Sequence, residues 1–294
     1  SIHQMGRMMI GDEAYAGSRS FFEMERQIRE TMGYRYAIPV HQGRAGERVF
    51  DFVLIKKHMI VPGNSHLDTT KPHIELAGGR AVHVPLVPGT FRPDFARIAA
   101  ALSPKTRAII VNTPHNPSAT VWTEQDMQRL AELLRPTDVL LIADEVYEHM
   151  VYDGVRHESV ARHEELAQRA FIVSSFGKTY HVTGWKVGYV AAPAALTAEF
   201  RKVHQFNVFT VNTPMQHGLA AFMADASHHL SLPAFYQRKR DLFRAGLAGS
   251  RFTLLPSEGS YFQCVDYSAI SDETEESFCR RLTTQVGVAA IPLS

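Results

Sequence analysis

Short apolar runs of strand length alternate with amphipathic segments of helix length over most of this 294-residue chain. That alternation is typical of an α/β fold in which helices cover a mainly parallel sheet. The expected strands are Met59–Val61, Ala81–Leu86, Arg107–Asn112, Val139–Ala143, Ala170–Ser174 and Val187–Ala192. The expected helices are Phe21–Met32, Gly43–Lys57, Pro93–Leu102, Thr123–Leu134, Ala194–His204 and Ala234–Ala248. Thr123 is expected to cap its helix, with acidic residues in the first turn.

The pattern changes after about Pro214. A helix comes first, then two expected strands, Phe252–Leu255 and Gly259–Val265, and then another helix. This order predicts a small α+β domain that follows the large one along the chain.

The charge balance indicates a small-molecule partner and argues against nucleic acid or a membrane. The chain has 31 Lys and Arg residues against 30 Asp and Glu, a net charge of +1, and no basic block. No apolar run reaches membrane-spanning length, and the opening residues lack a signal-peptide core. Two cysteines are too few for a disulfide framework or a zinc cage, and the 15 histidines show no metal-ligand spacing. We therefore expect a cytoplasmic protein without a metal site.

Polar side chains follow three of the expected strands: Asn116, then Asp144 and Tyr147, then Ser175 and Lys178. Ligands of open α/β sheets bind beyond the carboxyl ends of the strands, so these side chains are expected to meet. A desolvated lysine amine loses proton affinity and becomes a nucleophile toward carbonyls. Each residue alone fits an ordinary loop, and a lone aspartate at a strand end often caps a helix. Together they predict a cofactor site in which Ser175 and Lys186 are placed to hold a phosphate.

The strings around these residues resemble class I aminotransferases, especially the methionine and kynurenine type. The matching strings are Asn112–Ala119, Asp144–Tyr147, Ser175–Lys178, Trp185–Lys186 and Glu258–Phe262, and the resemblance runs from about Phe91 to Ser294. It implies the aspartate aminotransferase-type α/β fold and the cofactor pyridoxal 5'-phosphate (PLP).

The resemblance also supports a role for each site residue. Lys178 would carry PLP as a Schiff base and move the substrate proton, while Asp144 would hold the pyridine nitrogen. Asn116 and Tyr147 would bond the phenolic oxygen of the cofactor. Ser175 and Lys186 would bind its phosphate.

The first third of the chain, about residues 5–88, resembles another PLP family, the tryptophanases and tyrosine phenol-lyases. The matching strings are Met8–Ser18, His41–Glu47 and Gly63–Lys71. Gln42, Gly43 and Arg44 open an expected helix, whose free N–H groups suit a phosphate. The resemblance implies that these three residues bind the PLP phosphate. It implies that Tyr15 serves a neighbouring subunit's site as an acid or a cofactor contact; the alternative is a core tyrosine at a turn.

Both families share one fold, so the resemblance implies three segments. They are an N-terminal segment with dimer contacts (1–39), a large PLP-binding domain (40–214) and a small C-terminal domain (215–294). Leu67 stands where the lyases stack an aromatic ring on the cofactor. The chain ends at Ser294, before the arginine with which both families hold the substrate carboxylate, so we expect the small domain to be incomplete.

The leading functional prediction is a homodimeric PLP-dependent aminotransferase. It would move the amino group of a methionine-like or aromatic α-amino acid to a 2-oxo acid. The alternatives are a PLP-dependent lyase that eliminates a side-chain group and releases pyruvate and ammonia, and a non-catalytic protein that binds PLP.

Overall fold

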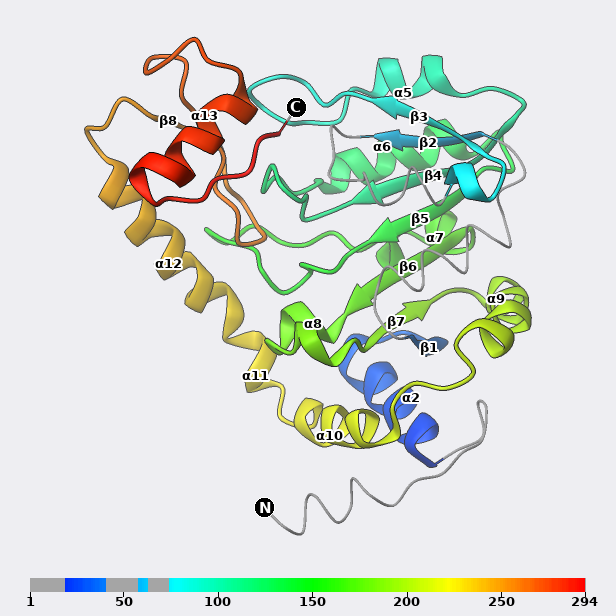
Figure 1. The fold of residues 1–294 in the computed structure, drawn as a ribbon. Helices are drawn as coiled ribbons and strands as arrows, with labels where there is room; N and C mark the ends of the chain where they lie inside the picture. The colour runs from blue at the N-terminus through cyan, green and yellow to red at the C-terminus, as the bar shows by residue number, and fades with distance from the viewer. Residues whose placement is uncertain (1–18, 41–57, 63–73, 294) are drawn as a thin grey trace.

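The computed structural model describes residues 19–40, 58–62 and 74–293 (Figure 1). Tyr15, Gln42, Gly43, Arg44 and Leu67 lie outside these residues. The expected helix Gly43–Lys57 also lies outside them.

The described strands form a seven-stranded sheet in the order β1-β7-β6-β5-β4-β2-β3 (Figure 1). The run from β3 to β6 is parallel, and β7 is antiparallel to both of its neighbours. The strands are β1 (Ala37–Val40), β2 (His58–Pro62), β3 (Arg80–Val84), β4 (Thr106–Asn112), β5 (Leu140–Asp144), β6 (Ala170–Ser175) and β7 (Gly188–Ala191). The six strands expected from the sequence are therefore confirmed, with shifts of one or two residues at their ends. The edge strand β1 was not expected.

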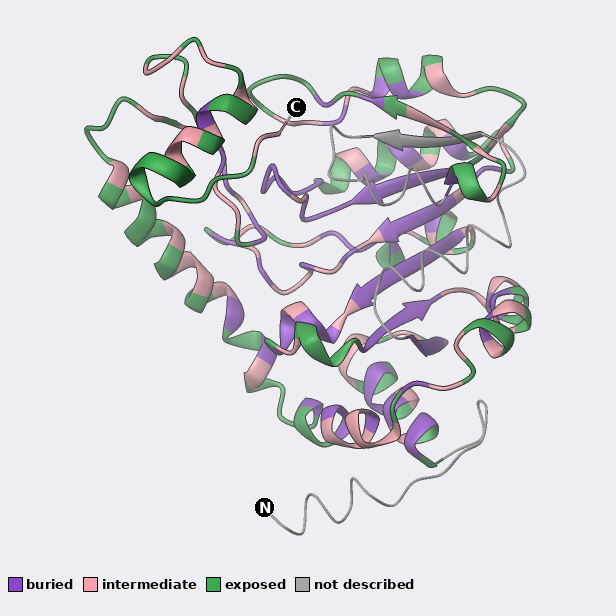
Figure 2. Cartoon of the chain, viewed as in Figure 1, coloured by how far each residue is buried: buried purple, intermediate pink, exposed green. Residues whose placement is uncertain are grey.

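Helices cover both faces of the sheet, because successive strand residues point to opposite sides. On one face Ile109 and Val111 of β4 pack against helices α5 (Phe95–Ala101), α6 (Glu124–Leu134) and α7 (Glu164–Ala167). Ala108 and Ile110 face the other side, where Phe200 of α9 (Ala194–Asn207) joins the core. Figure 2 shows the central strands buried and the outer helix faces exposed.

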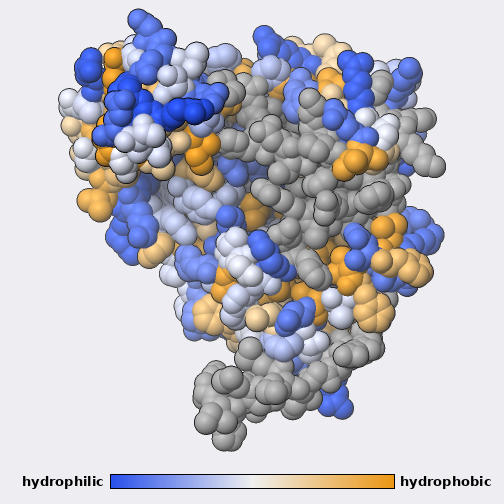
Figure 3. Space-filling view, viewed as in Figure 1, coloured by the Kyte–Doolittle hydropathy of each residue, from blue (hydrophilic) through white to orange (hydrophobic). Residues whose placement is uncertain are grey.

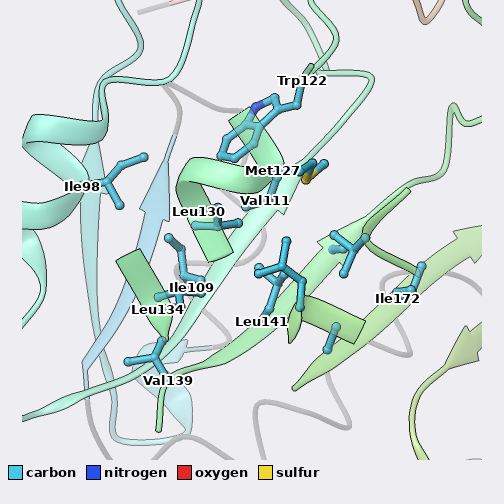
Figure 4. Packing of buried hydrophobic residues seen from close by; sticks show 14 of the residues in the cluster. Ile98, Ile109, Val111, Trp122, Met127, Leu130, Leu134, Val139, Leu141 and Ile172 are labelled. Carbon is cyan, nitrogen blue, oxygen red and sulfur yellow. The ribbon is translucent and has the colours of Figure 1, made fainter. Parts of the chain in front are cut away.

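Helix α6 illustrates how the sequence determines an element. The Thr123 side chain accepts a hydrogen bond from the backbone N–H of Asp126, whose carboxylate accepts one from the N–H of Thr123 at 2.9 Å. This capping box confirms the expected helix start. Met127, Leu130 and Leu134 recur at helical spacing and face the strands, as Figure 4 shows.

A third cluster lies beneath the β1 edge of the sheet. Helix α2 (Arg19–Met32) packs on α10 (Thr213–Met223), and both contribute apolar side chains to a cluster with the short helix α8 (Phe176–Thr179). The lower part of Figure 1 shows α2 and α10 side by side. The expected helices Phe21–Met32 and Ala194–His204 are thereby confirmed.

The C-terminal part begins with α11 (Ser227–Leu230) and the long helix α12 (Leu232–Leu247). It continues through β8 (Thr253–Leu254), β9 (Val265–Asp266), α13 (Glu275–Arg281) and a π-helical turn (Leu282–Val286). Figure 1 shows α12 and α13 along one side of the molecule. The division of the chain at residues 39 and 214 remains a prediction.

The expected strand Gly259–Val265 is wrong except at its last residue. Ser260 adopts a left-handed backbone conformation with φ 61°, which interrupts an extended run. The backbone of this segment bonds to residues outside the small sheet: Ser260 N–H donates to the Met150 carbonyl at 2.8 Å. The segment is therefore a loop that docks on the large α/β part.

None of the helices in the described part of the chain is both long and apolar enough to cross a membrane. Among the same residues there is no group of three or more His, Cys, Asp or Glu side chains that could hold a metal ion.

Candidate active site

The sheet register brings three of the predicted segments together at the carboxyl ends of the parallel strands. Asn112 at the end of β4 pairs with Asp144 at the end of β5, and Asp144 pairs with Val173 of β6. The loops that leave these strands carry Asn116, Tyr147 and Lys178, respectively. Neighbouring parallel strands end at the same edge, so the register explains why residues far apart in sequence share one site.

Hydrogen bonds tie the β4 and β5 ends together. The Asn112 amide donates to the Asp144 carbonyl at 3.0 Å, and Thr113 N–H donates to the same carbonyl at 3.1 Å. Asn116 N–H donates to the Asn112 side-chain oxygen at 2.8 Å. One Asp144 carboxylate oxygen accepts from Val146 N–H at 3.1 Å. Asp144 and Asn116 are both half-buried, and these hydrogen bonds fix the two strand ends relative to each other.

Lys178 lies in a tight turn directly after β6. Ser175 begins α8, and its hydroxyl accepts from Gly177 N–H at 3.2 Å. A Cβ on Gly177 would lie 2.8 Å from the Cα of Thr183, so this position requires glycine. The Thr183 hydroxyl donates to the Gly177 carbonyl at 3.0 Å. The turn therefore holds the half-buried Lys178 at the strand end.

Lys186 lies just before β7, where the chain re-enters the sheet after the Lys178 turn. Ser175 pairs with Gly188 in the antiparallel β6–β7 register, and Phe176 N–H donates to the Val187 carbonyl at 3.2 Å. Lys186 itself is exposed and has a left-handed backbone, with φ 58°. The hairpin thus brings Ser175 and Lys186 to the same end of the sheet.

Two tyrosines surround the lysine amine. The Tyr147 and Tyr261 rings are perpendicular at 5.1 Å, and the Tyr147 hydroxyl donates to the Tyr261 oxygen at 3.3 Å. Lys178 Nζ donates to the same oxygen at 2.5 Å. Burial, together with the hydrogen bond to Tyr261, raises the pKa of Tyr147, so Tyr147 stays a neutral phenol and a donor at neutral pH.

Sequence reasoning gave Tyr261 no role. It belongs to the aminotransferase-like string Glu258–Phe262, which was the only signal available. Its contact with Lys178 depends on how a distant loop docks.

A layer of buried carboxylates behind the site was also missed. Glu148 accepts from the Ser174 hydroxyl at 2.9 Å and from the Tyr189 hydroxyl at 2.8 Å. Fully buried Glu145 accepts from Val160 N–H and lies 2.9 Å from His157 Nε2. Both glutamates flank Asp144 and Tyr147 in sequence, so this layer connects the strand ends that carry the site. The acidic string itself was visible in the sequence.

A hollow of about 520 Å³ lies elsewhere, beside α2. It is lined by Phe22, Glu25, Arg26, Arg29, Glu30, Tyr34 and Arg35. None of the predicted site residues that the structure describes lines it. The convergence of side chains at the strand ends is the stronger indicator of chemistry, and we place the candidate site there.

The family model of class I and II aminotransferases matches residues 47–294. The chain belongs to this family. It is 51% identical over 228 residues to a methionine aminotransferase of Escherichia coli, a match that covers 77% of the chain and 59% of the relative. It is 32% identical over 257 residues to human kynurenine–oxoglutarate transaminase 1, covering 77% of the chain and 61% of that enzyme. The chain spans about three-fifths of the length of these curated relatives.

The fold agrees with solved aminotransferase structures. A crystal structure of an Escherichia coli methionine aminotransferase superposes with a TM-score of 0.93 at 41% identity, covering 100% of the chain and 79% of that structure. The expected aspartate aminotransferase-type fold is thereby confirmed. The family match begins inside the stretch that resembles the lyases, and that lyase resemblance remains a prediction.

Class I aminotransferases depend on PLP, and the described residues fit this cofactor. The half-buried amine of Lys178 suits the aldehyde carbon of PLP, and the carboxylate of Asp144 suits its pyridine nitrogen. Amide and phenol groups stand on neighbouring loops, and the hydroxyl and ammonium groups of one hairpin suit a phosphate. Whether Tyr15, Gln42, Gly43 and Arg44 join them is a prediction outside the described residues.

Proposed function

We propose that this chain acts as a PLP-dependent aminotransferase that moves the amino group of an α-amino acid to a 2-oxo acid. The observation that carries the proposal is the placement of Asn116, Asp144 and Lys178 on three neighbouring strand ends of an aminotransferase fold. The sequence similarity to methionine and kynurenine aminotransferases supports a substrate with a methionine-like or aromatic side chain.

When bound, PLP supplies an electron-withdrawing ring to the substrate nitrogen. Around that ring we assign Asp144 to the pyridine nitrogen and Asn116 with Tyr147 to the phenolic oxygen. Lys178 binds the cofactor through its amine and, once free, takes the proton from the substrate Cα. The phosphate ligands that we propose are Ser175, Lys186, Gln42, Gly43 and Arg44. Tyr15 is proposed to reach the site of a second copy.

The purified chain is tested with PLP, methionine and a 2-oxo acid, and the amino acid formed from the oxo acid is measured. Product should form in the wild type and disappear in Lys178→Ala. Lys105→Ala is the matched control, because Lys105 is exposed beside the amino end of β4, away from the site. Its activity should equal that of the wild type.

Two outcomes would contradict the proposal. Pyruvate and ammonia formed from tyrosine or an S-substituted cysteine without an oxo acid would indicate the lyase reaction. A visible cofactor band that survives dialysis, disappears in Lys178→Ala and accompanies no turnover would indicate a non-catalytic PLP-binding protein.

We further propose that the chain works as a homodimer. Large apolar side chains are exposed on three helices near the β1 edge of the sheet: Phe22 of α2, Phe206 of α9 and Phe222 of α10. On the face in Figure 3, apolar side chains gather over α9. A second copy would bury such a surface. Light scattering should give twice the chain mass, and Phe206→Ser should weaken the dimer; a monomer at all concentrations would contradict this.

A cytoplasmic location is also proposed. Both cysteines in the described residues are free thiols, as a reducing compartment would keep them. Burial raises the pKa of Cys264 to about 11, which makes it an inert thiol. Fractionation of the cells that produce the protein tests the location, and recovery outside the cytoplasm would contradict it.

A further inference from the structure

Tyr261 comes from the C-terminal part of the chain, yet its hydroxyl oxygen lies 2.5 Å from the amine of Lys178. The same amine is 5.2 Å from the centre of the Tyr261 ring. Neither the strand-end pattern nor the proposed cofactor contacts assign a role to this tyrosine. Tyr261 contacts Lys178 Nζ, the atom that binds the cofactor and takes the substrate proton in the proposed reaction.

The loop around Tyr261 is firmly docked. Ser260 N–H donates to the Met150 carbonyl at 2.8 Å, and Tyr152 N–H donates to the Glu258 carbonyl at 2.9 Å. Gly259 is packed so closely that a Cβ would lie 2.8 Å from the Met150 oxygen. Tyr261 is therefore held against Lys178 by the backbone on its N-terminal side.

An ion pair holds the start of the same loop. Arg92 and Glu258 are 2.5 Å apart, and Arg92 also donates to the Val121 carbonyl at 2.6 Å. The other Glu258 oxygen accepts from Val121 N–H at 2.9 Å. These contacts join the loop to the segment after β4, which also carries Asn116. Tyr261 and the strand-end residues thus belong to one connected unit.

The hydroxyl of Tyr261 is arranged as an acceptor. It receives hydrogen bonds from Lys178 Nζ and from the Tyr147 hydroxyl, and so uses both oxygen lone pairs. Asp144, at the β5 end, and Tyr236 of α12 act on the neighbouring Tyr147, and the Tyr236 ring lies 5.9 Å from the Tyr261 ring. A hydrogen bond accepted from an ammonium group is stronger than one accepted from a neutral amine.

We propose that Tyr261 is a catalytic residue that stabilises the ammonium form of Lys178 after the lysine has taken a proton from the substrate. In that step the Cα–H bond of the substrate breaks and an N–H bond forms on Nζ. The electron pair of the broken bond stays with the substrate. Tyr261 keeps its own proton throughout and accepts a hydrogen bond from the new ammonium group. The proposal rests on the proposed function for the origin of the proton, whereas the Lys178–Tyr261 contact exists in the chain itself.

The contact is tested first without cofactor. Reductive methylation with formaldehyde and cyanoborohydride modifies only neutral amines, and peptide mass spectrometry reads Lys178 separately from other lysines. Tyr261→Phe keeps the ring and removes the acceptor, so Lys178 should be methylated about ten times faster at pH 8. Tyr261→Leu, which also removes the ring, should change the rate in the same direction.

Two controls isolate the hydroxyl. Tyr236→Phe removes a nearby hydroxyl whose contact is with His181, at 3.4 Å, and should leave the Lys178 rate unchanged. Exposed Lys105 in the same digests should be methylated equally in all variants, which shows that the reaction conditions are equal. An unchanged or slower Lys178 rate in both Tyr261 variants would overturn the proposal.

Turnover provides the second readout. In Tyr261→Phe, kcat should fall about tenfold while KM for the amino acid changes little, because the lost hydrogen bond acts after binding. An unchanged kcat would overturn the proposed role. If the wild type shows no transamination, the proposed function fails, and the methylation result still decides whether Tyr261 controls the Lys178 amine.

Discussion

At the end of β5 two adjacent carboxylates have different environments. Asp144 is half-buried at the site, whereas Glu145 is fully buried and lies beside His157. Burial opposes the charge on His157. The hydrogen bond to Glu145 and the charges of Glu145, Glu148 and Glu158 outweigh that effect and raise the pKa of His157. The pair therefore stabilises the segment behind Asp144 in a pH-dependent way.

The stabilisation by His157 should be present at low pH and lost at high pH. Its pKa in the folded chain lies above the unfolded value of about 6.5, so the charge contributes fully below that value and declines as the pH rises through the folded pKa. His157→Phe should lower the free energy of unfolding by about 3–5 kcal/mol at pH 6, because a buried carboxylate loses its partner, and by less at pH 9. Urea unfolding at both pH values measures this.

His83→Phe is the control, because His83 is exposed on β3. Its effect on the free energy of unfolding should be small and equal at both pH values. An equal cost of His157→Phe at pH 6 and pH 9 would contradict the charged pair.

Glu148 should show energetic coupling to the hydroxyls that it binds. Glu148→Gln removes the charge that strengthens two buried hydrogen bonds, so the free energy of unfolding should fall by about 1–3 kcal/mol. Tyr189→Phe should then cost less in the Glu148→Gln background than in the wild type. A double-mutant cycle from urea unfolding measures the coupling, and strict additivity would show that the contact carries no energy.

At the residue scale, the sequence predicted candidate site residues where they follow strands directly. Asn116, Asp144, Tyr147 and Lys178 could be found because each lies within a few residues of an apolar run, and the sheet register brings them together. Tyr261 could not be found in this way. Its position depends on backbone hydrogen bonds to residues about a hundred positions earlier in the chain, which no local pattern encodes.

At the scale of elements, the loop 258–262 is as important as any strand, because it joins the C-terminal part to the site. Gly259→Ala would place a Cβ 2.8 Å from the Met150 carbonyl oxygen and 2.9 Å from the Pro114 side chain. Backbone must move to relieve this contact, so the free energy of unfolding should fall by about 1–3 kcal/mol. Differential scanning calorimetry measures the loss.

Gly246→Ala is the matched control. Gly246 lies within α12, and a Cβ there would meet nothing within 4 Å. Alanine favours a helix over glycine by about 1 kcal/mol, so this variant should gain stability. If both substitutions shifted the melting temperature in the same direction, the close packing of Gly259 would not be what matters.

The sequence predicted elements well where the apolar pattern was long. Strand β4 has seven residues and a clear apolar run, and it was expected almost to its ends. Strand β1 was missed because it has only four residues, one of them Pro39, and is defined by pairing with β7. The expected strand at Gly259–Val265 was apolar enough, but the N–H groups of Gly259 and Ser260 donate to the carbonyls of Ala119 and Met150 outside the small sheet. Tertiary contacts decided these two cases.

At the scale of the whole molecule, Arg240 of α12 joins the C-terminal part of the chain to the segment around Asp153. Its guanidinium binds both carboxylate oxygens of Asp153, at 2.6 and 2.8 Å, and the Ser257 carbonyl at 2.9 Å. Arg240 is largely buried, whereas Asp153 is exposed. Solvent therefore weakens the attraction between the two charges, but the two parallel hydrogen bonds still fix the orientation of the guanidinium on the carboxylate.

Arg240→Gln should therefore loosen the C-terminal part and lower the free energy of unfolding by about 1 kcal/mol. Limited proteolysis should cut the loop 256–262 faster than in the wild type, because the opened loop becomes accessible. Arg238→Gln changes an exposed arginine on the same helix and should leave the cleavage rate unchanged. Equal cleavage rates for the two variants would show that α12 is held by other contacts.

The sequence predicted a mainly parallel sheet but not its strand order. The apolar run of β7 resembles those of the parallel strands, and only its pairing with β1 and β6 reveals the opposite direction. Strand order depends on contacts between distant segments, so it becomes visible only when the chain is folded.

The edge strand β1 also determines when the sheet can be completed during synthesis. Ala37 pairs with Ala191, so β1 leaves the ribosome long before the strand that it needs. At ~5–20 residues per second, the ribosome requires on the order of ten seconds to make the intervening chain. During that interval the nascent segment exposes unpaired backbone groups and apolar side chains. The β1 edge of the sheet can therefore form only after β7, the second strand of the lysine-bearing hairpin, has been made.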